Sequence, residues 1–248
     1  MKRIIVLLIA LLWVLPLICT AEEETKLPFT IRAADFETDK VALTMDDCYD
    51  MEQVQQAVEI CKKYGVTITF FPLGEVLSPD YRDVWQSALD AGCEIGSHSF
   101  DHRSFPQMDP WSIISSLGRT QQALDETLGY HYEIRWLRPP YGQMGGSADG
   151  KIKSDQRIVS AIKKYGYEHI VKWNVSQTDP VKAMAKIKAG TIALYHSNKK
   201  DNRCLDTIIP QLLEKGLTPV TLSEMLGFDP PETGDELYVF DKKDYQAK

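Results

Sequence analysis

Two histidines and two adjacent aspartates are the residues whose types and spacing suit metal chemistry in this sequence. His98 and His102 lie four residues apart in the segment HSFDH, and on a helical turn both rings would point the same way. Asp46 and Asp47 end an apolar run, and in a regular strand their side chains would point to opposite faces. Asp47 with the two histidines makes a His-His-carboxylate set that leaves positions open for water and substrate. The simpler interpretations are surface histidines and an acidic turn, which Asp50 would suit.

An arginine and a third histidine are placed in the same way along the chain. Arg138 follows one apolar run and His196 follows another, just as the aspartates and His98 do. In α/β barrels the carboxyl ends of the strands carry the chemistry. We therefore expect these side chains to meet at one rim, where a carboxylate could act as a base and an imidazole as an acid.

Seven apolar runs and six amphipathic segments must position these residues. The strands are predicted at Val41–Met45, Thr67–Phe71, Glu94–Ser97, Ile134–Leu137, His169–Val175, Thr191–Tyr195 and Thr218–Thr221. The helices are predicted at Met51–Tyr64, Tyr81–Ala91, Pro110–Leu128, Ser154–Tyr165, Val181–Lys188 and Leu205–Lys215. Strands that alternate with helices predict a parallel α/β sheet, either open or closed into a barrel.

Four short motifs in the chain resemble those of the polysaccharide deacetylase family, also known as the NodB homology domain or carbohydrate esterase family 4. Residues 44–48, TMDDC, resemble TFDDG, and HSFDH fits H[ST]xxH. Residues 138–141, RPPY, fit RxPY, and residues 194–196, LYH, fit LxH. The motifs follow the family's order over roughly residues 39–227. The resemblance implies an α/β fold, a distorted (β/α)7 barrel in a single domain at residues 39–228.

The resemblance also implies a role for each matching residue. Asp47, His98 and His102 would hold a divalent metal ion, with zinc expected first and cobalt, nickel or manganese also suitable. Asp46 would be the general base and Arg138 would pair with it. The backbone N–H of Tyr141 would help to hold the oxyanion, and His196 would be the general acid.

The family likeness implies a hydrolase that removes N-acetyl groups from a peptidoglycan- or chitin-like glycan and releases acetate. The N-terminal segment described below predicts that it is secreted, periplasmic or envelope-associated. A non-catalytic glycan-binding protein on the same fold and an O-acetyl esterase are the alternatives. Three departures bear on this choice. Cys48 replaces the glycine of TFDDG. In the segment 173–180, where DxxDW is expected, Ser176 stands for the first Asp and Pro180 for the Trp, while Asp179 keeps the second Asp position.

The first 21 residues predict an export signal. Lys2 and Arg3 precede a 15-residue apolar run, and small residues follow at a possible cleavage site. An uncleaved anchor or a lipid on Cys19 would be the alternative, and either would be the protein's means of contact with a membrane. The acidic chain, with a net charge of −7, makes nucleic acid an unsuitable partner. We expect a monomer with an N-terminal segment at 22–38 and a surface tail at 229–248.

Four cysteines remain after the signal: Cys48, Cys61, Cys93 and Cys204. In an exported protein they permit two disulfides, and we expect at least one, with buried free thiols as the alternative. A Cys48–Cys204 pair is one candidate, since both cysteines follow motif-bearing strands.

Overall fold

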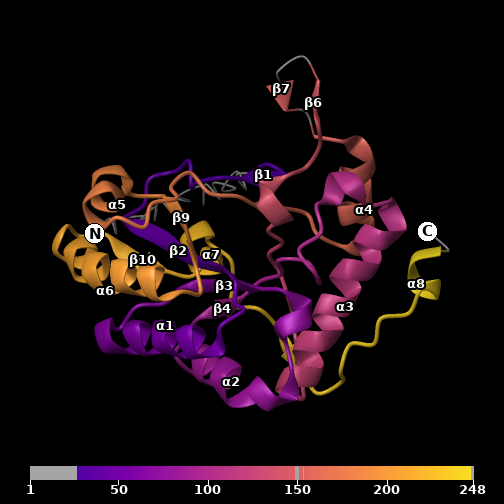
Figure 1. The fold of residues 1–248 in the computed structure, drawn as a ribbon, viewed down its shortest axis with the longest axis horizontal. Helices are drawn as coiled ribbons and strands as arrows, with labels where there is room; N and C mark the ends of the chain where they lie inside the picture. The colour runs from indigo at the N-terminus through magenta and orange to yellow at the C-terminus, as the bar shows by residue number, and fades with distance from the viewer. Residues whose placement is uncertain (1–26, 149–150, 153, 247–248) are drawn as a thin grey trace, which may run out of the picture.

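The computed structural model describes residues 27–148, 151–152 and 154–246 (Figure 1). The predicted export signal, including Cys19, lies outside the described residues, as does the beginning of the segment 22–38. The helices are α1 Met51–Tyr64, α2 Arg82–Asp90, α3 Pro110–Leu128, α4 Gln156–Tyr165, α5 Pro180–Lys186, α6 Lys199–Glu214, α7 Leu222–Leu226 and α8 Lys243–Gln246. The strands are β1 Thr30–Ile31, β2 Lys40–Asp47, β3 Thr69–Pro72, β4 Glu94–Ile95, β5 His131–Tyr132, β6 Ser147–Ala148, β7 Lys151–Ile152, β8 Ile170–Val171, β9 Ile192–His196, β10 Thr218–Val220 and β11 Thr233–Gly234.

The central strands form a ring around β2. This strand pairs in parallel with β3 and β9, and its first residues pair with β10. Beyond β3 lies β4, and single parallel bridges then join Ser97 to Leu137, Leu137 to Ile170, and Val175 to Ala193 of β9. The ring therefore closes, which confirms the distorted (β/α)7 barrel. The predicted strand Ile134–Leu137 contributes only Leu137 to this ring, through its two bridges to Ser97 and Ile170.

Side chains of β2 alternate between the helix layer and the barrel interior, as the period of two in a strand requires. Val41, Leu43 and Met45 join the large core that includes the apolar faces of α1, α3 and α6. Ala42 belongs to a smaller cluster. Thr44 and Asp46 lie on the same face of β2 as Ala42, and both are buried polar residues. The interior of the barrel is thus apolar in part and polar near the carboxyl end of β2.

Glu94, at the start of β4, is the centre of a buried polar network. Its carboxylate accepts hydrogen bonds from the Thr69 hydroxyl and from the Trp136 indole N–H, both at 3.0 Å. The backbone N–H and the hydroxyl of Ser223 in α7 also donate to it. Burial raises the pKa of Glu94, while these donors oppose the shift. The network ties α7 to three strand segments.

Helix boundaries follow local capping. The Asp50 carboxylate accepts the Glu52 and Gln53 N–H groups at the start of α1, and Gly65 ends that helix with φ 63°. Asp50 is therefore a helix cap. Asp109 caps α3 in the same way. These signals are local in sequence, so the predicted bounds of α1 and α3 are confirmed.

The tail from residue 229 lies largely exposed but contacts the barrel's helix layer. Its strand β11 pairs antiparallel with β5, and the Phe240 ring stacks on Trp111 at 5.7 Å between centroids. In Figure 1 the tail runs past α3 to the C-terminus. Within the described residues, no helix has the length and apolar character needed to cross a membrane.

The four cysteines are free thiols, and all are buried. Cys48 donates toward the Met45 carbonyl and Cys204 toward the Gln177 carbonyl, so each thiol has a different partner. The expectation of at least one disulfide, with Cys48–Cys204 as the candidate, is therefore wrong for these four cysteines.

Candidate functional site

The polar residues that follow the strands meet at one end of the barrel, as expected. Asp46 at the end of β2 is in register with His196 at the end of β9. His98 follows β4, and Arg138 follows the bridge at Leu137. Because these strands run parallel, their carboxyl ends share a rim and bring distant parts of the sequence together.

Asp47, His98 and His102 place three metal-binding atoms within 4.8 Å of one another. The Oδ1 atom of Asp47 lies 3.5 Å from Nε2 of His98 and 3.6 Å from Nε2 of His102. This oxygen is buried and has no hydrogen-bond partner among the described residues. A buried carboxylate oxygen without a donor is costly unless a cation balances it. The three residues thus fit a divalent cation with nitrogen and oxygen ligands.

The orientation of His98 also fits metal binding. Its Nδ1 atom lies 2.7 Å from the Arg138 backbone carbonyl, so Nδ1 carries the proton and donates it. The lone pair of Nε2 consequently faces Asp47 and His102. In metal-binding histidines, a hydrogen bond from the other ring nitrogen, such as this one from Nδ1, fixes the orientation of the ring. Burial lowers the pKa of His98, which favours the neutral form that a metal requires.

Left-handed backbone explains how adjacent aspartates reach one site. Asp47 has φ 67° and Cys48 has φ 61°. A regular strand would send Asp46 and Asp47 to opposite faces, yet carboxylate oxygens of both lie within 3.7 Å of Nε2 of His98. Cys48 adopts the positive φ that the family's glycine would adopt freely, so the turn survives the substitution at some cost in strain.

The other non-glycine residues with positive φ in the described part of the chain also lie at this rim: Ser99, His102 and Tyr141. Such backbone strain persists only where the surrounding structure enforces it, and it gathers at functional sites. Tyr141 is 60% exposed, and its ring lies 4.4 Å from that of His102 between centroids. The backbone of Tyr141 is therefore beside the proposed metal ligands.

Asp46 and Arg138 form a buried ion pair behind the three ligands. One oxygen of Asp46 accepts a hydrogen bond of 2.6 Å from Arg138, whose side chain has no exposed surface. The same Arg138 nitrogen donates to the Thr44 hydroxyl at 2.7 Å. The second Asp46 oxygen faces His98 at 3.7 Å. One carboxylate oxygen is thus held by the guanidinium and the other points toward the metal-binding residues.

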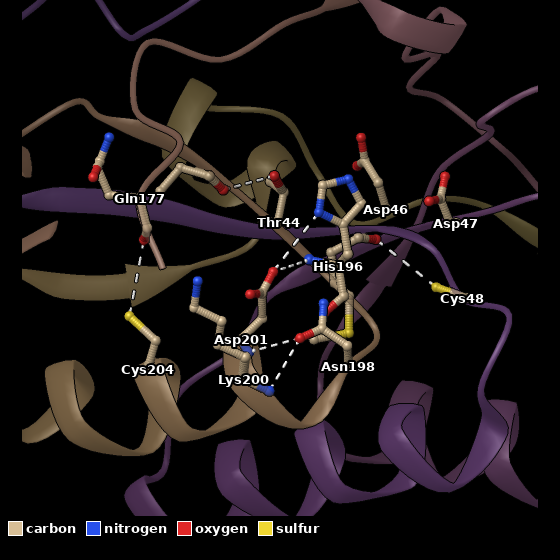
Figure 2. Close-up of polar contacts among 12 residues, drawn as sticks. Thr44, Asp46, Asp47, Cys48, Gln177, His196, Asn198, Lys200, Asp201 and Cys204 are labelled. Atoms are coloured by element: carbon tan, nitrogen blue, oxygen red, sulfur yellow. Dashed lines mark hydrogen bonds and ion pairs between the residues drawn. The ribbon is translucent and has the colours of Figure 1, made fainter. Parts of the chain in front are cut away.

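His196 is held by an acid that the sequence motifs did not identify. The Asp201 carboxylate accepts the His196 backbone N–H at 2.7 Å, and the same oxygen lies 3.7 Å from Nδ1 of the ring (Figure 2). Asp201 is buried in the first turn of α6, while the His196 side chain is 47% exposed. The Asp201 carboxylate raises the pKa of His196 against the effect of burial, with further contributions from Asp46 and Asp47.

The altered fourth motif does not supply this acid. Asp179 caps α5, where it accepts the Lys182 N–H at 2.9 Å, and Pro180 is the first residue of that helix. Ser176 is exposed. Asp201 precedes the helix that we predicted at Leu205–Lys215. The sequence offered one signal for an earlier helix start, because Asn198 is a typical N-cap residue.

The remaining two histidines have structural partners. His131 pairs with the buried Asp125 at 2.7 Å, and His169 hydrogen-bonds to the Pro28 carbonyl at 3.0 Å.

Comparisons with known proteins agree with this geometry. The polysaccharide deacetylase family matches residues 33–170 of the chain. A peptidoglycan-N-acetylglucosamine deacetylase of Bacillus cereus is 27% identical over 193 residues, which cover 75% of this chain and 68% of that protein. A bifunctional xylanase/deacetylase of Pseudobutyrivibrio xylanivorans is 27% identical over 75% of this chain. The chain spans only 30% of that relative's length.

Two solved structures share the fold. The peptidoglycan N-acetylglucosamine deacetylase Bc1960 has a TM-score of 0.68 and 24% identity, over 82% of this chain and 95% of that one. A CE4 family pseudoenzyme of Bacillus anthracis has a TM-score of 0.69 and 24% identity, over 81% of this chain and 70% of that one. The fold is therefore shared by proteins described as enzymes and as pseudoenzymes.

Proposed function

Because the chain belongs to the polysaccharide deacetylase family, we propose that it is a metal-dependent hydrolase that removes N-acetyl groups from a polysaccharide or oligosaccharide. The observation that carries this proposal is the buried, unpartnered oxygen of Asp47 facing two imidazoles. A peptidoglycan- or chitin-like glycan is the proposed substrate, and acetate is the released product. The curated relatives named for peptidoglycan support the first of these glycans.

The proposed metal ligands are Asp47, His98 and His102, with zinc the first candidate. A divalent ion bound there would lower the pKa of water and polarise the acetamide carbonyl. Asp46 is the proposed general base, because one of its oxygens faces the ligands while Arg138 holds the other. The positive charge of Arg138 keeps the base oriented and balances its charge in the buried site.

The departing amine needs a proton, and His196 is the proposed donor. It stands opposite Asp46 in the register of β2 and β9, so base and acid flank the same space. Asp201 holds the peptide group and faces the ring of His196. The Tyr141 backbone N–H is the proposed donor to the oxyanion of the tetrahedral intermediate.

A non-catalytic glycan-binding function is the second candidate, because a structural neighbour is described as a pseudoenzyme and the fourth motif is altered here. The complete Asp46–Arg138 and His196–Asp201 pairs favour catalysis. We further propose export to the cell envelope or medium and a monomeric state. Membrane contact, where it occurs, would be through the N-terminus alone.

The decisive experiment measures acetate release from N-acetylated glycans by protein loaded with zinc, cobalt, nickel or manganese. Asp46→Asn should lose about 10²–10⁴-fold of the rate, as expected for loss of a general base. This variant should keep its metal, since Asp47 and not Asp46 is the proposed ligand. Near wild-type turnover of the amide by Asp46→Asn would refute the mechanism.

A further inference from the structure

A cavity of about 830 Å³ opens beside the proposed metal site, and its lining includes aromatic and cationic side chains. Tyr141, whose ring contacts His102, forms one wall. Trp173 lies against Gly142 on the same wall, since a Cβ added at Gly142 would come within 3.1 Å of the indole. The volume is in the range of ligand-binding pockets. The cavity is therefore placed to hold the part of a glycan next to the reacting acetamide.

Two cations line this cavity side by side. The strands β1 and β8 pair in parallel with Ile31 opposite Val171, so Arg32 and Lys172 follow at equivalent positions. The backbone N–H of Lys172 donates to the Ile31 carbonyl at 2.8 Å. Both Arg32 and Lys172 line the cavity. The Lys172 carbonyl in turn accepts a hydrogen bond from Arg138. The backbone of Lys172 thus contacts the residue that holds the proposed base.

Neither cation has a carboxylate partner within the residues that the structure describes. Lys172 is only 9% exposed. Burial lowers the pKa of Lys172, and the neighbouring positive charge of Arg32 lowers it further. Arg32 is exposed and Lys172 is nearly buried, so in a chain of net charge −7 the cavity carries two adjacent cations that no described carboxylate pairs with. An anionic ligand group would balance both charges.

We propose that Arg32 and Lys172 bind a carboxylate of the glycan, so that the substrate is an acidic N-acetylated glycan and not a neutral chitin-like chain. This inference rests on the proposed deacetylase function and names the substrate class of that same site. Arg32 offers a planar fork for a carboxylate and Lys172 a compact charge from the cavity wall. Trp173 and Tyr141 offer aromatic surface for the sugar rings.

Binding is tested first, on zinc-loaded Asp46→Asn protein, so that turnover does not interfere. The calorimetric probes are strands that contain N-acetylmuramic acid, the same strands with their carboxylates methyl-esterified, and N-acetylglucosamine oligomers of equal length. The acid strands should bind about tenfold or more tightly than the ester, as the loss of hydrogen bonds to a charged group predicts. Equal affinity for acid and ester, or no binding of the acid, overturns the proposal.

Oligosaccharides that alternate N-acetylglucosamine with glucuronic acid identify the source of the carboxylate. Preference for the muramic strands assigns the bound carboxylate to the lactyl ether group of muramic acid. Preference for the uronate strands assigns the bound carboxylate to the glucuronic acid next to the N-acetylated sugar. Either preference over neutral oligomers supports the proposal.

Kinetics on the catalytically intact protein give a second readout. Arg32→Gln and Lys172→Gln should raise KM for the acid strands about tenfold, leave kcat within about twofold, and leave KM for neutral oligomers unchanged. Lys186→Gln is the matched control, because it removes one positive charge from an exposed position of α5. Equal effects of all three variants would contradict the assignment. Absence of acetate release from every probe would refute the hydrolase, while the binding data would still decide the ligand.

Discussion

Replacement of Asp201 by Asn tests the residue that stands in for the missing acid of the fourth motif. The change keeps the size of the side chain and an oxygen that can accept the hydrogen bond from the His196 backbone N–H. In the wild type this hydrogen bond is 2.7 Å long. It removes the negative charge 3.7 Å from Nδ1 of the ring. The variant should therefore fold, keep its metal, and lose the electrostatic support of the proposed general acid.

The size of the effect is bounded by the contribution of the acid itself. General acid catalysis typically contributes about 10²–10⁴-fold. The ring remains attached to β9, and a misplacement of about 1 Å at a reacting group can cost about 10²-fold. We therefore expect kcat/KM on an N-acetylglycan to fall about 10- to 10²-fold. The fall should be smaller on an activated acetyl ester, whose leaving group needs no proton.

The pH dependence has a definite sign. Asp201 raises the pKa of His196, so the imidazole stays protonated to a higher pH in the wild type. A general acid must be protonated to act, and activity is lost as pH rises through its pKa. Asp201→Asn lowers that pKa, so the alkaline limb of the kcat/KM profile should move to lower pH.

Asp179→Asn is the matched control, because Asp179 keeps the second acidic position of the motif but only caps α5. Asn caps helices about as well as Asp, so activity and stability should stay near wild type. An unchanged rate and pH profile in Asp201→Asn would refute the reasoning. So would a larger loss in Asp179→Asn than in Asp201→Asn.

Three further predictions concern the metal, the barrel interior and the thiols. His98→Ala should lose most of its bound metal in elemental analysis. His131→Ala should keep the wild-type metal content, because His131 pairs with Asp125 and not with the proposed ligands. Equal metal content in the two variants would refute the ligand set. Glu94→Gln should destabilise the protein by about 1–3 kcal/mol in urea, because an amide N–H would face buried donors. Because burial raises the folded pKa of Glu94, the stability that this group contributes to the wild type should decline as pH rises through the folded pKa, and Glu94→Gln should lack this dependence. The four described cysteines should react as four thiols when the protein is unfolded without reductant. A count of two reactive thiols among these four would contradict this prediction and indicate a disulfide. Cys61 and Cys93, whose thiols contact each other, would be the pair to test.

The parts of the fold that sequence predicts well have causes that are local along the chain. The helix α1 lies between the cap Asp50 and the left-handed Gly65, and both signals are adjacent to the amphipathic pattern. Strand β2 is an apolar run that is buried on both sides. By contrast, closure of the barrel depends on single bridges at Leu137 and Val175. Such pairing is decided by packing between distant segments, and no periodic pattern of a few residues reveals it.

The same distinction applies to the site. The strand-end positions of Asp47, His98 and His196 were predictable because each follows an apolar run. The proximity of Asp46 and Asp47 to one imidazole was not, because it depends on a positive φ at Asp47 that the strand pattern argues against. The family motifs predicted Asp47 as a metal ligand and Asp46 as the base beside it, and the backbone geometry explains how both carboxylates come near His98.

Asp201 was missed because the start of its helix was missed. We placed the helix at Leu205–Lys215, where the apolar period begins, but α6 starts at Lys199 with Asn198 as its cap. The first turn is polar: Lys199 and Lys200 are exposed, and Asp201 contacts the end of β9. A carboxylate is favourable in such a turn, because the free N–H groups of the helix carry partial positive charge. This helix start therefore supplies a buried acid next to His196 without any residue from the fourth motif, and in the proposed mechanism Asp201 takes the place of the acid that is missing at Ser176.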